Sequence, residues 1–147
     1  MTKLEHRPDN EIFQLTLDFD APENQPLEMV CHDRRDRHGW THNGPKVVGA
    51  QTRKFTWVYI GYCRTFDEVK QKLRRRGKTP EGQWCQAVKA TFQHDAKYHR
   101  GIADASWSDS DGNIAFPRVD AFGEVSFPAM TDNDFSGDYR WLVEVLE

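Results

Sequence analysis

The stretch that decides the expected fold is RKFTWVYIGYCRTFDEVKQKLRRRGKTPEGQWCQAVKATFQ, residues 53–93, which contains one strand pattern and two helix patterns in succession. Within residues 53–63, aromatic and β-branched side chains alternate, so that apolar groups occupy both faces. Such side chains fit a pleated surface, and a strand with two apolar faces is typical of the middle of a sheet. We therefore predict a central strand over residues 53–63.

A helix is predicted directly after this strand. Thr65 and Glu68 have the spacing of a capping box, in which the hydroxyl and the carboxylate each accept from the backbone of the first turn. Apolar residues then recur at helical spacing, which favours a helix over residues 66–76. Its last turn is basic, which suits the partial negative charge at a helix C-terminus.

A second helix is predicted over residues 80–93. Thr79 and Pro80 have the residue types of an N-cap and of a first helical position. The turn between the two helices, residues 77–79, is three residues long and contains glycine, which is typical of a helix-turn-helix motif. The simpler interpretation is an αα-hairpin packed on a sheet.

Strand patterns flank the helix pair on both sides. Before it, apolar residues alternate with polar residues from Phe13 to Phe19. After Gly101, short apolar runs are separated by turn residues, and residues 138–147 fit either a strand or a helix. The expected fold class is α+β, with a small antiparallel or mixed sheet and one helix pair (αα-hairpin) followed by a β-meander.

Length and composition predict one domain over residues 1–147, with a flexible N-terminal end at residues 1–11. The hydrophobic share is 37%, which is low and indicates a small core or long polar loops. The chain contains no apolar run of about 18 residues, so we expect no association with a membrane. Its three cysteines lie far apart and cannot all pair, which favours a reducing, cytoplasmic compartment.

Charge is distributed unevenly along the chain. The net charge is −3, but residues 31–100 carry a net +10 while residues 1–30 carry −5 and residues 101–147 carry −8. One interpretation is a basic face that binds a polyanion. Two others are that the acidic ends neutralise the basic middle within the fold, or that the acidic C-terminal part binds a protein.

Our leading hypothesis is a non-enzymatic protein that contacts a nucleic-acid backbone, DNA or RNA, through residues 53–89. Basic and aromatic residues interleave along the predicted strand, and cations gather at the end of the first helix. Glutamine side chains near the start of the second helix have the groups needed to read an adenine edge. The expected phosphate contacts are Arg53, Lys54, Arg64, Arg74, Arg75, Arg76, Lys78 and Lys89, and the expected base contacts are Gln83 and Gln86.

A second hypothesis is a small accessory protein, of the kind that phages and other mobile elements encode, which binds and inhibits a protein partner. Its acidic and aromatic C-terminal part would cover a basic groove on a nucleic-acid-handling machine. The residues expected to do so are Asp132, Asp134, Phe135, Asp138 and Trp141.

A third hypothesis starts from Gln14-Leu15-Thr16-Leu17-Asp18-Phe19. This segment resembles the short linear motif by which bacterial polymerases and repair proteins bind the sliding clamp. The resemblance implies that Gln14 enters a polar subsite while Leu17 and Phe19 fill an apolar pocket. An amphipathic strand accounts for the same alternation.

We find no pattern that predicts an enzyme, a cofactor or a metal site. His38 and His42 have a spacing that metal ligands use, but the chain has no Cys-x-x-Cys pair, and nearby glycines argue against a helix that would hold them. No nucleophile, acid and base converge at a recognisable spacing, and no glycine-rich phosphate loop is present.

Overall fold

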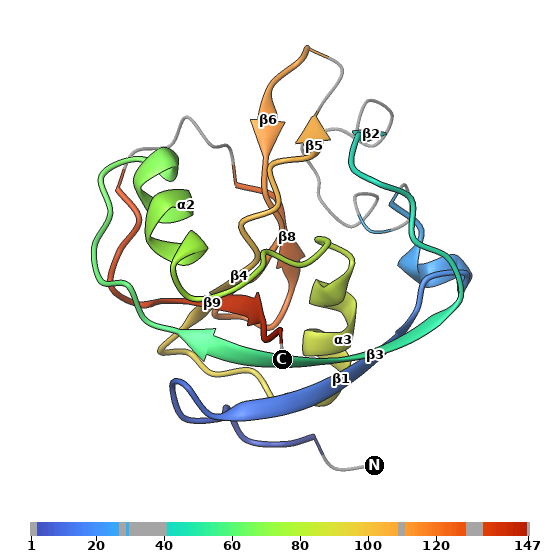
Figure 1. Cartoon of the computed structure of the whole chain (residues 1–147), viewed down its shortest axis with the longest axis horizontal. Coiled ribbons are helices and arrows are strands. Elements are labelled where there is room, and N and C mark those ends of the chain that lie inside the picture. Colours follow the sequence, from blue (N-terminus) through green and yellow to red (C-terminus); the bar gives the residue numbers. More distant parts are fainter. Residues whose placement is uncertain (1–2, 27–28, 30–40, 109–110, 129–133, 147) are drawn as a thin grey trace.

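The computed structural model describes residues 3–26, 29, 41–108, 111–128 and 134–146 (Figure 1). These residues form mostly strands, with two α-helices among them. In chain order the elements are β1 (Ile12–Asp18), η1 (Pro22–Asn24), β2 (Thr41–His42), β3 (Ala50–Val58), α2 (Phe66–Arg74), α3 (Trp84–Thr91), β4 (His99–Gly101), β5 (Trp107–Ser108), β6 (Ile114–Ala115), β7 (Arg118–Val119), β8 (Val125–Ser126) and β9 (Tyr139–Glu144).

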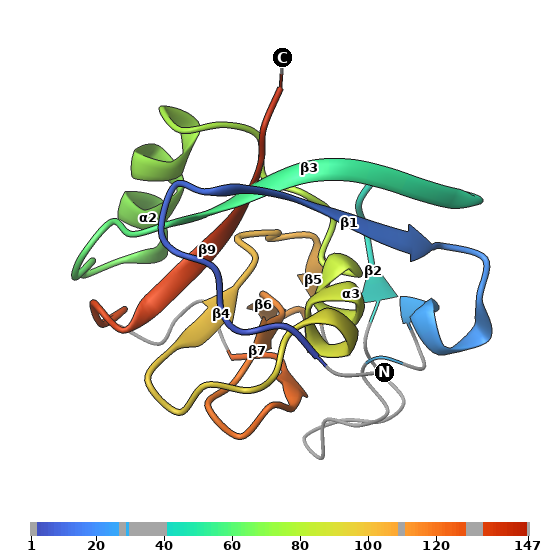
Figure 2. The same cartoon turned by 90° about the horizontal axis from the view of Figure 1, so that it is seen from below.

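The main sheet is mixed and curls around α3. Its strand order is β1-β3-β9-β4-β7-β8, and β9 runs antiparallel to β3 but parallel to β4. Helix α3 contacts β1 at one edge of the sheet and both β7 and β8 at the other. Figure 2 shows the same arrangement, with α3 enclosed between the two ends of the sheet. A smaller sheet has the order β2-β5-β6.

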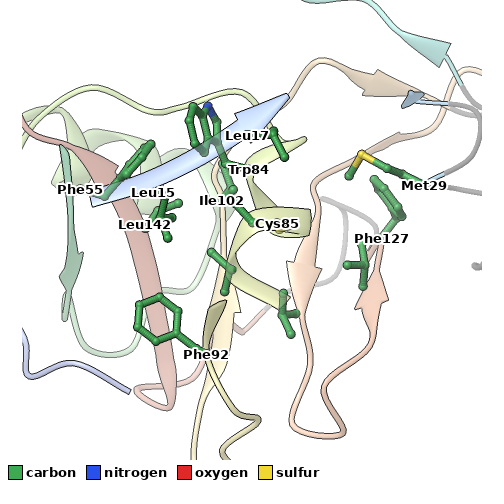
Figure 3. Close-up of a cluster of buried hydrophobic side chains, with 14 of the residues drawn as sticks. Leu15, Leu17, Met29, Phe55, Trp84, Cys85, Phe92, Ile102, Phe127 and Leu142 are labelled. Carbon is green, nitrogen blue, oxygen red and sulfur yellow. The ribbon is translucent and has the colours of Figure 1, made fainter. Parts of the chain in front are cut away.

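The concave side of the sheet contains the larger hydrophobic core (Figure 3). The apolar face of α3 contributes Trp84 and Val88, and β3 contributes Phe55 and Trp57, which are fully buried. The prediction of a central strand is confirmed, since β3 pairs with both β1 and β9 and its second half is buried. Its predicted bounds, residues 53–63, are wrong, because β3 covers Ala50–Val58.

The opposite side of the sheet packs against α2. Val58, Trp141 and Val143 project from β3 and β9 into a second buried cluster with Phe66 and Leu73 of the helix. Consecutive residues of one strand thus enter different clusters, as the period of two requires. Both faces of β9 are buried, and this explains why residues 138–147 show apolar residues at strand spacing and at helical spacing together.

The expected αα-hairpin is wrong. The second helix begins at Trp84 rather than at residue 80, so nine residues separate α2 from α3. Asp104 Oδ2 accepts a hydrogen bond of 2.8 Å from the Gly82 amide, which holds residues 80–83 outside the helix. Lys78 also forms a β-bridge with Glu144. The two helices therefore lie on opposite faces of the sheet instead of packing on each other.

The expected β-meander is also wrong. Of the strands that follow the helices, β5 and β6 join the small sheet, and β9 inserts between β3 and β4. The insertion pairs the end of the chain with the predicted central strand, and such a long-range pairing leaves no local signal in the sequence. Of the described residues, none belongs to a helix with the length and apolarity needed to cross a bilayer.

Candidate functional site

A cavity of about 450 Å³ lies beside the C-terminal end of α2. Three cationic side chains line it, Lys70 and Arg74 from the helix and Lys78 from the segment that follows. The hydroxyl-bearing residues Thr79 and Ser106 line it as well. Cations and hydroxyl groups are the donors that proteins commonly direct at phosphate oxygens.

The local structure of α2 accounts for this placement. Thr65 adopts an extended backbone, and its hydroxyl accepts a hydrogen bond of 3.2 Å from the Glu68 amide, which confirms the predicted N-cap. Glu68 also accepts from the Arg64 amide. With Phe66, Val69 and Leu73 of the helix buried, Lys70 and Arg74, four residues apart, lie on one side of the helix and line the cavity together.

Glu81 lines the same cavity, but its carboxylate is occupied. Its Oε1 accepts hydrogen bonds from Arg53 at 2.8 Å and from the Trp84 indole at 3.2 Å. Arg53 also donates to Glu144 at 3.0 Å. This carboxylate therefore forms its ion pair away from the cations of the cavity.

Asp104 is the other carboxylate at the cavity, and it is buried. Its Oδ2 accepts from the Gly82 amide, from the Trp107 indole at 3.2 Å and from His42 Nε2 at 3.2 Å. Its Oδ1 accepts from the Ser106 amide at 3.0 Å. Burial alone raises the pKa of Asp104, but the hydrogen bonds outweigh it and hold the pKa below its ordinary value. The ionised carboxylate thus serves as an anchor for the loops around the cavity.

The cations of this region form no ion pair with a carboxylate in the part of the chain that the structure describes. We define the α2 basic surface as Lys70, Arg74, Arg75, Arg76 and Lys78; Lys70 is half-buried, and the other four are exposed. The ion pairs found in the described part of the chain include none of these five side chains. Arg76 donates to the Asn10 side-chain oxygen, which is neutral. The helix dipole favours cations at this end of α2, but it does not neutralise them.

The other predicted phosphate contacts lie elsewhere. Arg53 is held by its two glutamates, and Lys89 pairs with Glu124 at 3.2 Å. Lys54 is half-buried on β3, where its carbonyl oxygen accepts from the Val145 amide. Arg64 is exposed ahead of α2 but does not line the cavity. The structure therefore places Arg74 and Lys78 at one cavity and leaves Arg75 and Arg76 exposed after them in the chain. Arg53 and Lys89 are engaged in ion pairs.

The predicted base contacts do not line this cavity. Gln83 is buried at the start of α3, with its amide nitrogen 3.5 Å from His42 Nδ1. Gln86 donates to the Glu23 carbonyl oxygen at 2.8 Å. Both glutamines are engaged within the fold, so this arrangement offers phosphate contacts without base readout.

Of the eight residues named in the two protein-binding hypotheses, the four apolar residues are in the core. Leu17 and Phe19 are buried in β1 and just after it, while Gln14 is exposed. Phe135 and Trp141 are buried in the cluster around α2. Of the acidic residues, Asp134 accepts a hydrogen bond from the Tyr62 hydroxyl, Asp138 is exposed, and Asp132 lies outside the described residues.

Of the two histidines with metal-like spacing, the structure describes only His42. His38 falls outside the described residues, and His42 is engaged by Asp104 and packs against the Trp107 ring at a centroid distance of 4.5 Å. Over the described ranges, no three side chains of the metal-binding types are grouped closely enough to hold an ion.

Sequence reasoning missed Lys70, Ser106 and Asp104. The spacing of Lys70 and Arg74 was a usable signal, because residues four apart share one side of a helix. Asp104 and Ser106 had no such signal, since their role depends on the contact of Asp104 with Gly82, 22 residues earlier in the chain.

Comparison of the chain with protein-family models, with curated proteins and with solved structures finds no match.

Proposed function

We propose that the protein binds the sugar–phosphate backbone of a nucleic acid through the α2 basic surface. The observation that carries the proposal is that Lys70, Arg74 and Lys78 line one cavity while the carboxylates beside them are occupied by other donors. Backbone phosphates are attracted by such unneutralised cations, and binding releases the counterions condensed on the nucleic acid.

The proposal is narrower than the interface expected from the sequence. It leaves out Arg53 and Lys89, which have carboxylate partners, and also Lys54 and Arg64, which lie outside the α2 basic surface. It leaves out base reading by Gln83 and Gln86 as well. It adds Lys70. We therefore expect binding that is nearly independent of nucleotide sequence, because phosphate contacts fix position and orientation without identifying bases.

The protein-partner hypotheses have less support from the geometry. Their apolar anchors, Leu17, Phe19, Phe135 and Trp141, are buried in the two cores. A partner would have to unfold part of the main sheet in order to reach them.

The experiment is a fluorescence-anisotropy titration of labelled duplex and single-stranded DNA of mixed sequence at low salt. The double variant Arg74→Gln/Lys78→Gln is compared with a matched control, Lys46→Gln/Lys97→Gln, which removes two exposed cations outside the α2 basic surface. We expect the first variant to bind at least about tenfold more weakly, which corresponds to about 1.4 kcal/mol, and the control to bind like wild type. Equal affinities for both variants, or no binding by the wild type, would overturn the proposal.

A further inference from the structure

A second basic cavity, of about 320 Å³, lies between the C-terminal end of α3 and the turn that joins β7 to β8. It shares no lining residue with the cavity beside α2. Lys3, Lys89 and His94 line it from the surface, and Arg100 of β4 lines it from the interior. Glu124, which pairs with Lys89 at 3.2 Å, is the acidic residue that lines it.

Arg100 is the unusual member of this set, because it is a buried cation that forms no ion pair with any described residue. Burial lowers the pKa of Arg100 and outweighs the opposite effect of the Asp95 carboxylate, which acts from beyond ion-pair distance. The residue surface of Arg100 is 2% exposed. Its Nε donates to His6 Nδ1 at 3.1 Å, and its Nη1 donates to the Gln93 carbonyl oxygen at 3.0 Å. Its Nη2 is buried without a hydrogen-bond partner, and none of the ion pairs among the described residues includes it. A buried charge is costly unless an opposite charge and further hydrogen bonds accompany it.

His6 does not supply the missing charge. A guanidinium group only donates, so His6 Nδ1 must accept, and the imidazole is therefore neutral. Burial, followed by the nearby Arg100, lowers the pKa of His6 to about 4, which agrees with the neutral form. The site thus retains the positive charge of Arg100 and an unused donor of its guanidinium.

The aromatic residue Phe122 also lines this cavity. Phe122 is 87% exposed, the most exposed of the large hydrophobic residues that the structure describes. The backbone that carries it is held by the turn, since Asp120 Oδ1 accepts from the Phe122 amide at 2.9 Å and from the Glu124 amide at 3.1 Å. An exposed ring beside a basic cavity offers a stacking surface to a nucleobase.

We propose that this cavity binds a mononucleotide, with Arg100 contacting the phosphate and Phe122 stacking on the base. Lys89 also contacts the phosphate, exchanging its weak, solvent-exposed pair with Glu124 for it. The planar guanidinium matches the geometry of phosphate oxygens, and a phosphate would supply both the missing negative charge and an acceptor. The cavity is of the size that small ligands occupy. The inference does not depend on the proposed function, because it rests on other residues.

The test is an NMR titration of the full chain with AMP, adenosine and inorganic phosphate as separate probes. We expect AMP to shift the amide signals of Phe122 and Gly123, with a Kd below about 1 mM, and adenosine and phosphate each to bind at least about tenfold more weakly. Absence of these shifts at about 10 mM AMP, or equal affinities for phosphate and AMP, would overturn the proposal.

Two variants test separately which residues bind the base and which bind the phosphate of AMP. Phe122→Ala is expected to weaken AMP about tenfold while leaving phosphate unchanged, and Lys89→Gln to weaken both probes. Both side chains lie at the surface, so these variants test the proposal even where Arg100→Lys fails to fold. Lys97→Gln is the matched control, and Arg74→Gln/Lys78→Gln should retain AMP affinity even if it loses DNA binding. Wild-type AMP affinity in both Phe122→Ala and Lys89→Gln would contradict the site.

Discussion

At the scale of single residues, Asp104 holds together segments that are far apart in the sequence. It accepts from the Gly82 amide before α3, from His42 of β2 and from Trp107 of β5. Gly82 is packed so closely that a Cβ there would lie 2.5 Å from both Pro117 and the Trp107 indole nitrogen. The turn ahead of α3 therefore depends on this one carboxylate and on the absence of a side chain at residue 82.

We predict that Asp104→Ala lowers the free energy of unfolding by about 3 kcal/mol. The substitution leaves buried donors of Gly82 and Trp107 without an acceptor, and each such donor costs about 1–3 kcal/mol. Urea unfolding followed by circular dichroism measures the change. Asp138→Ala, which removes an exposed carboxylate, is the control and should stay within about 0.5 kcal/mol of wild type. A similarly small change in Asp104→Ala would show that the carboxylate is not an anchor.

His6 gives a prediction about pH. Burial, followed by the nearby Arg100, lowers the pKa of His6 from 6.5 to about 4 in the folded protein. Above about pH 6.5 both the folded and the unfolded forms are neutral, and the contribution to stability is complete. As the pH falls from about 6.5 to about 4, the unfolded chain takes up a proton that the folded protein does not, so stability is lost.

The measurement is the free energy of unfolding of wild type and His6→Gln. Glutamine retains an oxygen that can accept from Arg100, but it does not titrate. We expect the wild type to lose about 1–2 kcal/mol more than His6→Gln between about pH 7.5 and about pH 5, a range that allows for partial solvent screening. His94→Gln, at an exposed histidine, should follow the wild type. Parallel pH profiles for wild type and His6→Gln would place the pKa of His6 near its ordinary value.

At the scale of elements, the two threonines predicted as N-caps differ in the structure. Thr65 caps α2 through the Glu68 amide, whereas α3 begins at Trp84 with Gln83 as its N-cap and without a side-chain cap bond. We predict that Thr65→Ala lowers the free energy of unfolding by about 1 kcal/mol. Thr79→Ala should change it by less than about 0.5 kcal/mol. Equal losses in the two variants would contradict the observed start of α3.

Elements defined by local pattern were predictable, and elements defined by distant contacts were not. The alternation in β1 and β3 and the cap of α2 are properties of neighbouring residues, and the sequence shows them directly. The start of α3 depends on Asp104, and the place of β9 depends on pairing with both β3 and β4. Their partners are far away in the sequence, so periodicity and capping rules favoured a compact helix pair and a meander instead.

In the candidate site, too, features with a local signal in the sequence were predictable and features set by distant contacts were not. The cluster Arg74, Arg75, Arg76 and Lys78 was predicted from its local charge density. The engagement of Arg53, Lys89, Gln83 and Gln86 was not predictable, because each contacts a residue at least 28 positions away that sequence spacing does not indicate. A list of cations in a sequence therefore overestimates a phosphate-binding surface until their carboxylate partners are known.

At the scale of the whole molecule, the uneven charge of the chain is partly neutralised by folding. The acidic C-terminal part supplies Glu144 to Arg53 and Glu124 to Lys89. The pair of Asp9 with Arg140 at 2.8 Å joins the two acidic ends to each other and does not neutralise the basic middle. The α2 basic surface has no such pair among the described residues, so its cations remain without an ion pair around the C-terminal end of α2.

Phosphate binding by the α2 basic surface predicts that the affinity for duplex DNA falls steeply as the salt concentration rises. If the five cations of the α2 basic surface each neutralise one phosphate, the slope of log K against log salt concentration is about −4.5 for wild type. Two fewer contacts in Arg74→Gln/Lys78→Gln reduce the magnitude of the slope to about 2.7, while Lys46→Gln/Lys97→Gln keeps the wild-type slope. A wild-type slope near zero, or an identical slope in Arg74→Gln/Lys78→Gln, would contradict the account.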